Sequence, residues 1–566
     1  MRTTGKQGAV LIATALALAV ITPAVRSASP LAGNWKVAAV SEGKEITLLI
    51  IKVEDGDGKP AIKVLWPAGI KDTPLEDVSV DANSLRFTLR TRSAPLRMIA
   101  HAPKGEAKAK KLLGSVHPPG NAEPLILERT DKTETAAKDA EKDSPGFDEL
   151  ERALEAKDAA KQEEGLKALV KKRADAPVAL AATEALAQIA IAKGATADKI
   201  RSLADQYVKT ASVYGRDMEL HATLQMARGL LSSGEKTPLA LDYAQKAEKQ
   251  LTPKDSLDQQ AAILKTLTRA LNKAGKGDEA KTIKARIAKL DERLDEEFEK
   301  RAIPFKLEAA PRRKGNSERV VLLELFTGTQ CPPCVAADIA CDAVLKSYKP
   351  SEVVVLQYHL HIPGPDPLTN TDSVARQEYY GKDIEGTPTA FLDGKPTEPL
   401  GGPSSGSKES YDSLRKQLDG VLQKKAGASI KLDVQRTGDK INVSAEVADL
   451  TKTGDRVRLR FALVEEVVRY PGPNGQRLHH HVVRSFIGSV KGYALLEATE
   501  KQKLTANLAD VKKSLNDYLT GFAKANPFPG DDWPLNLKRL KVVAFVQDDK
   551  SKEILQAVQT DVPEAK

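Results

Sequence analysis

Cysteine and aromatic residues are scarce in this chain. Its 566 residues include 3 Cys, and Trp, Tyr and Phe together make up 4% of them. So few cysteines exclude a small scaffold held together by disulfides. Neither sign of charge dominates, because 86 Lys and Arg stand against 77 Asp and Glu, interleaved along the chain, which gives nucleic-acid binding little support. The apolar share of 41% argues against wholesale disorder, and the length predicts several domains.

Long hydrophobic runs are also few, and the clearest lies near the N-terminus. Arg2 and Lys6 precede the apolar run Ala9–Ile21, and small residues follow it. This order is typical of a secretory signal, and the run is shorter than the roughly 18 residues that a membrane span needs. We therefore expect residues 1–28 to be a signal peptide and the protein to be periplasmic or extracellular. Membrane contact is expected only if this segment is retained.

The first region after the signal has the pattern of β-strands. Residues 31–129 contain apolar, β-branched stretches such as Glu45–Val53, and later stretches alternate apolar and polar residues. We predict a small antiparallel sheet or barrel with Trp35 in its core. Its opening, Leu31–Trp35, resembles the start of lipocalin-type barrels. A polar segment without apolar periodicity, residues 130–146, is predicted to be a linker.

The second region is predicted to be helical. Residues 147–301 are rich in Ala, Leu, Lys and Glu, and helical stretches end on Gly194, Gly234 and Gly275. A period of about 40 residues is typical of helix-hairpin solenoids. The last unit, Leu267–Ala280, resembles the tetratricopeptide repeat. Such a segment is either a docking surface for partner proteins or a spacer, and the sequence leaves both open.

The third region, residues 319–424, contains residues suited to thiol chemistry. A buried strand is followed by a Cys-x-x-Cys motif, a helix, a second buried strand and a Gly-Thr-Pro-Thr segment that leads into another strand. In order, these are Val320–Phe326, Cys331-Pro332-Pro333-Cys334, Val335–Lys346, Glu352–Leu360 and Gly386–Gly394.

This order resembles the thioredoxin-like fold superfamily over about 100 residues. The resemblance implies that Cys331 is the nucleophile and Cys334 the resolving thiol. It also implies that Pro388, in a cis peptide bond after Thr387, lies beside the sulfur atoms. Glu324 would be the buried acid that takes the proton of Cys334, although it stands one residue further from the motif than in thioredoxins. The alternative is a glutamate at a strand end that faces solvent or a lysine.

These residues predict an exported thiol-disulfide oxidoreductase acting on protein or small-molecule disulfides. A cysteine at a helix N-terminus has its thiolate stabilised by free backbone N–H groups and the helix dipole, so no cofactor is required. We expect exported thiol or disulfide proteins and a redox partner protein as partners. The direction of electron flow stays open. The alternative is a non-catalytic envelope binding or scaffold protein in which the Cys331–Cys334 pair is a static disulfide.

Histidines near the motif suggest one further alternative. His359 and His361 are expected on one strand face near the cysteines, where they could make a copper-delivery site, tune the redox pair, or only form hydrogen bonds. A separate run, His479–His481, is expected at the surface of a hairpin. The third cysteine, Cys341, is expected to be a buried thiol.

The last region is predicted to be a β-sandwich of immunoglobulin type. Apolar alternation recurs after Ala426, with a helix from about Glu500 to Lys524. The expected fold is thus multi-domain α+β. Its parts are a signal peptide (1–28), a small β domain (31–129), a linker (130–146), a helical repeat domain (147–301), a linker (302–318), a thioredoxin-like domain (319–424) and a sandwich-like domain (426–566).

Overall fold

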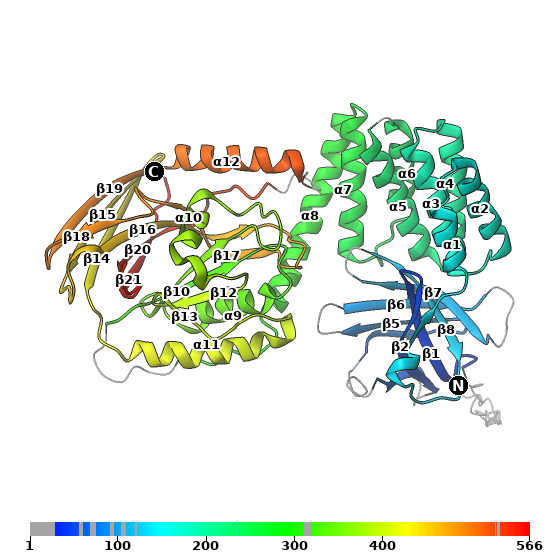
Figure 1. Ribbon diagram of the computed structural model, residues 1–566, viewed down its shortest axis with the longest axis horizontal. Helices are drawn as coiled ribbons and strands as arrows, with labels where there is room; N and C mark the ends of the chain where they lie inside the picture. The colour runs from blue at the N-terminus through cyan, green and yellow to red at the C-terminus, as the bar shows by residue number, and fades with distance from the viewer. Residues whose placement is uncertain are drawn as a thin grey trace, which may run out of the picture. The chain divides into compact units, whose positions relative to one another are not determined.

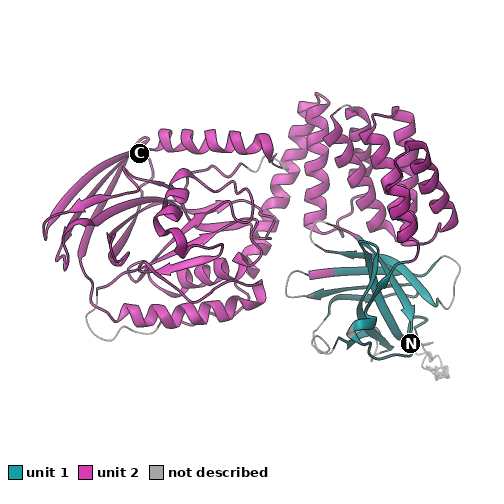
Figure 2. Cartoon of the chain, viewed as in Figure 1, with its two compact units in different colours: residues 1–89, 97–117, 123–144 teal, residues 90–96, 118–122, 145–566 magenta. Residues whose placement is uncertain are grey.

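The computed structural model describes residues 29–55, 60–67, 75–90, 95–103, 109–118, 121–234, 236–310, 318–526, 528 and 533–565. The expected signal peptide lies outside the described residues, as does part of the expected linker 302–318. The fold is mixed α and β (Figure 1). Two compact units divide the chain (Figure 2): residues 1–89, 97–117 and 123–144 form one, and residues 90–96, 118–122 and 145–566 form the other. In the described part of the chain, no helix combines the length and apolar character needed to cross a bilayer.

The first unit is built on an antiparallel sheet, as the apolar alternation predicts. Its strands follow the order β3-β2-β1-β8-β7-β6-β5-β4, and the terminal strands β3 and β4 contact each other. Inside the expected linker 130–146, the short strand Glu141–Asp143 also pairs with β2, so the end of that segment belongs to the sheet. The strands are β1 (Gly33–Ser41), β2 (Lys44–Asp55), β3 (Pro60–Trp66), β4 (Glu76–Val80), β5 (Ser84–Arg90), β6 (Pro95–His101), β7 (Lys111–His117), β8 (Glu123–Arg129) and β9 (Glu141–Asp143).

Trp35 lies in the core of this sheet, as expected. Its side chain is buried, its indole N–H donates to the carbonyl of Leu31, and the Arg129 guanidinium lies 4.4 Å from its ring. Arg129 also donates to the carbonyl of Ala32. Together these contacts fasten the start of β1 to the end of β8, so the tryptophan has a packing role.

The helical segment consists of successive packed helices. Neighbours along the chain contact each other, and α3 and α5, and α5 and α7, also touch. Gly194, Gly234 and Gly275 have φ values of 64°, 78° and 73° and end α3, α5 and α7, which confirms that these glycines close helices. The helices are α1 (Phe147–Leu154), α2 (Ala159–Lys172), α3 (Pro177–Ala192), α4 (Ala197–Ser212), α5 (Arg216–Ser233), α6 (Thr237–Lys249), α7 (Leu257–Lys273) and α8 (Gly277–Arg301).

The segment that follows α8 contacts the next domain. Ile303, Phe305 and Leu307 pack against a core that contains Tyr411 and Leu414, and the Phe305 and Tyr411 ring centroids are 5.4 Å apart. The described first half of the expected linker 302–318 is therefore packed chain, because its apolar side chains find a hydrophobic surface.

The region with the cysteines is a sheet with helices on both faces. Strands β10 and β11 are parallel, as two consecutive buried strands predict, and β12 is antiparallel to β10. Alternate residues of β10 face opposite sides: Leu323 and Leu325 pack with α9 and α11, whereas Leu322 and Phe326 pack with Tyr380 of α10. The elements are β10 (Val321–Thr327), α9 (Cys334–Ser347), β11 (Val353–His359), α10 (Thr371–Tyr380), β12 (Thr389–Leu392), β13 (Lys395–Pro396) and α11 (Ser407–Leu422).

The strands expected in a separate sandwich extend this same sheet. Its order is β13-β12-β10-β11-β17-β16-β20-β21, in which β11 and β17 pair in parallel, so a boundary near residue 425 divides one continuous sheet. Sandwich-like packing is nevertheless present, since a second sheet, β14-β15-β19, shares a core with β16 and β20. The strands are β14 (Ser429–Thr437), β15 (Lys440–Ala448), β16 (Gly454–Arg469), β17 (Leu478–Phe486), β18 (Tyr493–Leu495), β19 (Glu500–Asn507), β20 (Leu540–Asp548) and β21 (Ile554–Asp561).

The expected helix over Glu500–Lys524 is wrong in its first third. Residues Glu500–Asn507 form β19, and α12 extends over Leu508–Ala525. The exposed faces of both elements are polar. The sequence pattern therefore does not show where the strand ends and the helix begins. Residues Glu500–Asn507 form a strand because they pair with β15. Asn507 caps α12, because its side chain accepts the backbone N–H of Ala509.

Candidate functional site

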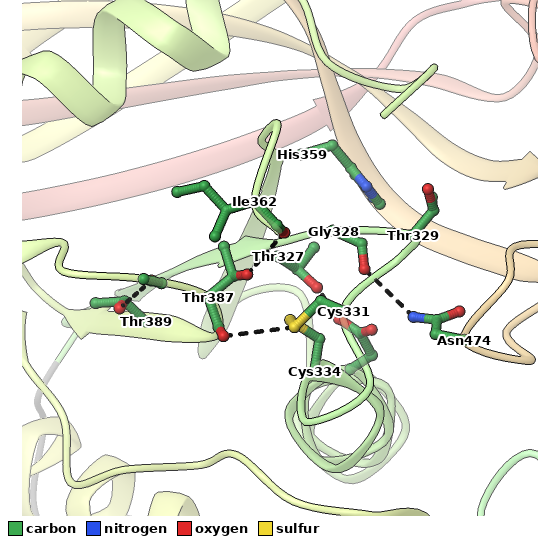
Figure 3. The surroundings of a disulfide bond; sticks show 12 residues. Thr327, Gly328, Thr329, Cys331, Cys334, His359, Ile362, Thr387, Thr389 and Asn474 are labelled. Carbon is green, nitrogen blue, oxygen red and sulfur yellow. Dashed lines mark hydrogen bonds between the residues drawn. A yellow bond between two sulfur atoms is a disulfide. The ribbon is translucent and has the colours of Figure 1, made fainter. Parts of the chain in front are cut away.

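The two motif cysteines form a disulfide at the start of α9 (Figure 3). The Cys331–Cys334 bond has an S–S length of 2.06 Å, and the two Cα atoms are 5.3 Å apart. Helix α9 begins at Cys334, and Cys331 lies in the turn before it, where its carbonyl accepts the N–H of Cys334. The first N–H groups of the helix are occupied, since those of Cys334, Val335 and Ala336 donate to the carbonyls of Cys331, Pro332 and Gly402. A sulfur atom in this position still lies at the positive end of the helix dipole, which favours negative charge.

The segment around Pro388 lies beside the disulfide. The Thr387–Pro388 peptide bond is cis, as the resemblance implies, and the carbonyl oxygen of Thr387 is 3.4 Å from the Cys331 sulfur. The Thr387 hydroxyl donates to the carbonyl of Ile362. In a dithiol state, the Cys331 S–H could donate to the Thr387 carbonyl; in the disulfide there is no proton to donate.

Both sulfur-bearing residues are buried. Cys331 is 1% exposed and Cys334 is fully buried, whereas Pro332 and Pro333 between them are exposed. A thiolate that attacks Cys331 therefore finds almost none of that residue at the surface. The sequence does not indicate this burial. Two segments from distant parts of the chain bind the turn before Cys331, and we call them the covering segments.

One covering segment is the hairpin loop between β16 and β17, residues 470–477. Its Asn474 donates from the backbone N–H to the carbonyl of Thr329 and from the side chain to the carbonyl of Gly328 (Figure 3). At the base of the hairpin, Arg469 and Arg477 form ion pairs with Asp291 and Asp295 of α8. The turn before Cys331 is thus held by a hairpin that also binds the helical segment.

The second covering segment is the loop after β11. The Asp366 carboxylate accepts the N–H groups of Thr329 and Leu368, and the Gln330 side chain donates to the carbonyl of Pro365. The Gln330 amide thus holds the loop beside the cysteines.

Glu324 is buried, as expected, but it lies on the opposite face of the sheet from α9. Its carboxylate accepts two hydrogen bonds from Arg376, at 2.8 and 2.9 Å, and one each from the hydroxyls of Tyr358 and Tyr380. It shares its face with Leu322 and Phe326, and α9 packs on the other face. The expected proton transfer between Glu324 and Cys334 is therefore wrong, since a two-residue alternation places them on opposite sides.

A second buried carboxylate, Asp338, lies on the correct face. It follows Cys334 by one helical turn on α9, and it accepts a hydrogen bond of 2.8 Å from the hydroxyl of Thr327 at the end of β10. Burial raises the pKa of Asp338 to about 7, although the Thr327 hydrogen bond and nearby His359 oppose the rise. The sequence signal for it was a carboxylate four residues after the second cysteine, inside an apolar helix.

The two motif histidines separate in the structure. β11 ends at His359, which is buried with its Nδ1 atom 3.1 Å from the Asp366 carboxylate, while its Nε2 atom lacks a hydrogen-bond partner within the described residues. His361 is exposed in the loop and accepts the backbone N–H of Asp366. The expectation that both share a strand face is wrong, because the strand stops between them.

The later histidine run is not at the surface. His479 and His481 are buried on β17, and burial lowers their pKa values to about 3 and about 4, so both are neutral at physiological pH. The His479 ring lies 5.1 Å from that of His359. His480 faces α9, where its Nδ1 atom is 2.9 Å from Asp342. Among the residues that the structure describes, no three His, Cys, Asp or Glu side chains are placed to hold a metal ion.

Cys341 is buried and free, as expected of a thiol on the apolar face of α9. Burial, with Asp338 and Asp342 nearby, raises its thiol pKa well above the ordinary value. It is therefore a protonated, inert thiol in the core.

Comparison with known proteins adds little to this geometry. No protein-family model and no curated protein sequence matches the chain. Among solved structures, it is similar to HBP35 of Porphyromonas gingivalis, with 18% sequence identity and a TM-score of 0.31, over 45% of this chain and 78% of that one. So low a TM-score does not establish a shared fold, and the function is argued from the site itself.

Proposed function

We propose that this chain is an exported thiol-disulfide oxidoreductase that works through Cys331 and Cys334 in a thioredoxin-like domain. The observation that carries the proposal is the disulfide at the start of α9 with the carbonyl of Thr387, before cis-Pro388, beside the Cys331 sulfur. The strand order β13-β12-β10-β11, with β10 and β11 parallel and β12 antiparallel to β10, supports the thioredoxin-like assignment. Export rests on the sequence of residues 1–28.

The exchange moves one electron pair and is reversible. In the reducing direction, the Cys331 thiolate attacks a substrate disulfide, forms a mixed disulfide and releases one substrate sulfur as a thiolate. Cys334 then loses its proton and attacks the Cys331 sulfur. This step restores the Cys331–Cys334 disulfide and releases the second substrate sulfur as a thiolate. The substrate is reduced by two electrons and the cysteine pair is oxidised by two.

Asp338 is the residue that we assign to the proton of Cys334. It lies one turn along the same helix, on the face that carries Thr327 and His359, and its pKa of about 7 lets it both accept and return a proton near neutral pH. Glu324 is excluded from this role by its position on the other face and by its pairing with Arg376.

The second candidate function is a binding or scaffold protein in which the disulfide is static. The observation that favours it is the burial of the pair, with Cys331 at 1% exposure and Cys334 at 0%. A disulfide that no thiolate reaches would only fasten the start of α9 to the preceding turn.

A redox titration with thiol trapping separates the two functions. The protein is equilibrated in glutathione or dithiothreitol buffers, free thiols are alkylated, and the oxidised fraction of the pair is measured by mass spectrometry. We expect reversible reduction of Cys331–Cys334 and catalysed reduction of a model protein disulfide, with a rate that falls at least about 1000-fold in Cys331→Ser.

Cys341→Ser is the matched control, because Cys341 is buried in the same helix and has no role in exchange. It should leave the redox titration and the activity unchanged. A pair that stays oxidised in strong reductant, together with activity that Cys331→Ser does not lower, would establish the static disulfide instead.

A further inference from the structure

The described aromatic residues include a surface cluster beside the redox site. The chain has only 3 Trp, 11 Tyr and 11 Phe, and five of these lie together on α12, on the hairpin 470–477 and on the segment after α12. Successive ring centroids are 6.3 Å apart for Tyr518 and Phe522, 5.5 Å for Phe522 and Phe528, and 5.1 Å for Phe528 and Trp533. The Tyr470 ring is 6.3 Å from that of Phe528. We call these five side chains the aromatic patch.

The patch is accessible. Trp533 is 37% exposed, and the other four side chains are partly exposed. Contiguous apolar surface of this kind marks interaction sites on soluble proteins, and aromatic rings supply much of the binding energy at protein interfaces.

The patch is connected at two points to the turn that carries Cys331. At one point, the Tyr518 hydroxyl donates to the carbonyl of Asp366, whose carboxylate accepts the N–H of Thr329. At the other, Tyr470 begins the hairpin whose Asn474 donates to the carbonyl of Thr329. Both connections end on Thr329, two residues before Cys331, so the aromatic patch is fixed to the same turn that holds the disulfide.

A cavity adjoins the aromatic patch at Phe528, on the side of helices α7 and α8. It has a volume of about 570 Å³ and includes Phe528, Arg469 and side chains of α7 and α8 among its walls. Apolar residues such as Ile287 and Ala288 alternate there with charged ones, including Arg269 and Glu292. The helical segment thus contributes walls of a cavity that adjoins the aromatic patch at Phe528.

We propose that the aromatic patch binds an extended, apolar segment of a polypeptide substrate whose cysteine reacts at Cys331. This inference rests on the proposed function and commits it to polypeptide disulfides. Three successive ring contacts form a surface longer than a disulfide of two small thiols can cover. An extended chain advances about 3.3 Å per residue, so residues roughly four to six positions from the reacting cysteine lie about 13–20 Å from it, clear of the disulfide itself.

Two synthetic peptides test the proposal with the full-length reduced protein. Each contains one cysteine linked by a disulfide to 5-thio-2-nitrobenzoate, and they differ only in carrying three Leu or three Ser residues four to six positions from that cysteine. Attack by Cys331 releases the coloured thiolate, which reports the rate. The small disulfide of 2-mercaptoethanol is the third substrate.

For the natural sequence we expect kcat/KM for the Leu peptide to exceed that for the Ser peptide by about tenfold. In the double variant Phe522→Ala/Trp533→Ala, this ratio should fall to below about twofold while the rate with the small disulfide stays unchanged. Leu496→Ala is the control, because Leu496 is 59% exposed and lies outside the aromatic patch; it should leave all three rates as they are.

Two outcomes would overturn the inference while leaving the proposed function intact. One is an active natural protein that does not distinguish the two peptides. The other is a double variant that loses activity equally on all three substrates, which would make the aromatic residues structural. A natural protein that exchanges with none of the substrates would contradict the proposed function and the inference together.

Discussion

The two faces of the central sheet bury a carboxylate in different ways. On the face that packs with α10, Glu324 accepts four hydrogen bonds, two of them from the guanidinium of Arg376. On the face that packs with α9, Asp338 accepts one side-chain hydrogen bond, from the neutral hydroxyl of Thr327. Burial alone therefore does not identify a functional acid. The two carboxylates are distinguished by how far hydrogen bonds and a cationic partner compensate the charge of each.

The pKa shifts of Arg376 on one face and Asp338 on the other reflect this difference. Burial lowers the pKa of Arg376, but the nearby Glu324 carboxylate outweighs this and keeps that pKa well above its ordinary value, so the guanidinium stays charged. Burial raises the pKa of Asp338 to about 7, which allows that carboxyl to gain and lose a proton near neutrality. On the α10 face, Glu324 belongs to a structural ion pair. On the α9 face, Asp338 is suited to proton transfer beside Cys334.

The largest effect should come from breaking the compensated face. Arg376→Met leaves the Glu324 carboxylate buried with no cationic partner, and we expect the free energy of unfolding to fall by about 3–5 kcal/mol, measured by urea denaturation at pH 7. The double variant Glu324→Leu/Arg376→Met removes both charges and should recover most of the loss. A single variant that loses less than about 1 kcal/mol would show that Glu324 is not held by charge pairing.

On the α9 face, removing the buried carboxyl group of Asp338 should raise the free energy of unfolding. A carboxyl whose pKa is raised on folding destabilises the protein as the pH rises above its unfolded pKa, and the full cost is reached above the folded pKa of about 7. Since one pH unit corresponds to about 1.4 kcal/mol, Asp338→Asn should raise the free energy of unfolding at pH 8 by at most about 4 kcal/mol, with no gain near pH 3.5.

The same variant should slow the resolving step, because Cys334 loses its proton acceptor. We expect release of a trapped mixed disulfide at pH 7 to become at least about tenfold slower, while the first attack by Cys331 is unchanged. Thermal and urea denaturation at pH 3.5, 6 and 8 give the stability profile, and rapid-mixing kinetics give the two steps. A variant that is no more stable at pH 8 and resolves at the natural rate would place the proton elsewhere.

Much of this architecture could be predicted from local sequence patterns. The helix-ending glycines, the parallel pair β10 and β11, the disulfide motif at the start of α9 and buried Cys341 all depend on residues close together in the chain. Each is set by the periodicity of apolar residues or by the backbone freedom of glycine, which the sequence shows directly.

The errors have different physical origins, and one of them is pairing between distant segments. Nothing near His479–His481 indicates that β17 pairs in parallel with β11, and that pairing buries two of the three rings. The role of Glu324 toward Cys334 was implied by the resemblance to thioredoxins, yet the alternation of side chains along β10 turns it toward Arg376. Asp338 was missed because a single acid in an apolar helix is ordinarily a solvated residue.

A smaller effect is expected where the α9 face meets β17. His480 lies 2.9 Å from Asp342, with Lys346 and Glu299 nearby; burial lowers its pKa, but Asp342 outweighs this and raises it overall. A histidine whose pKa rises on folding stabilises the protein below its unfolded pKa, near 6.5, and the contribution is lost as the pH rises through the folded pKa. His480→Gln should therefore cost roughly 1–2 kcal/mol at pH 6 and much less at pH 9, measured by urea denaturation.

The matched control for His480 is His361→Gln, because His361 is exposed and lies in a loop. It should change the free energy of unfolding little at either pH. Equal losses at pH 6 and pH 9 in His480→Gln would show that packing, not charge, explains the contact with Asp342.

The finest distinction between the two faces comes from removing a single hydroxyl on each. Thr327→Val deletes the side-chain donor to Asp338, and Tyr358→Phe deletes one of four donors to Glu324. Each should cost about 1 kcal/mol of stability. Only Thr327→Val should change the pH dependence of the resolving step. Loss of the hydroxyl donor raises the pKa of Asp338 further, so the midpoint of that pH dependence should move to higher pH. Equal pH profiles in the two variants would mean that Asp338 does not control Cys334, and the contrast between the faces would then be one of stability alone.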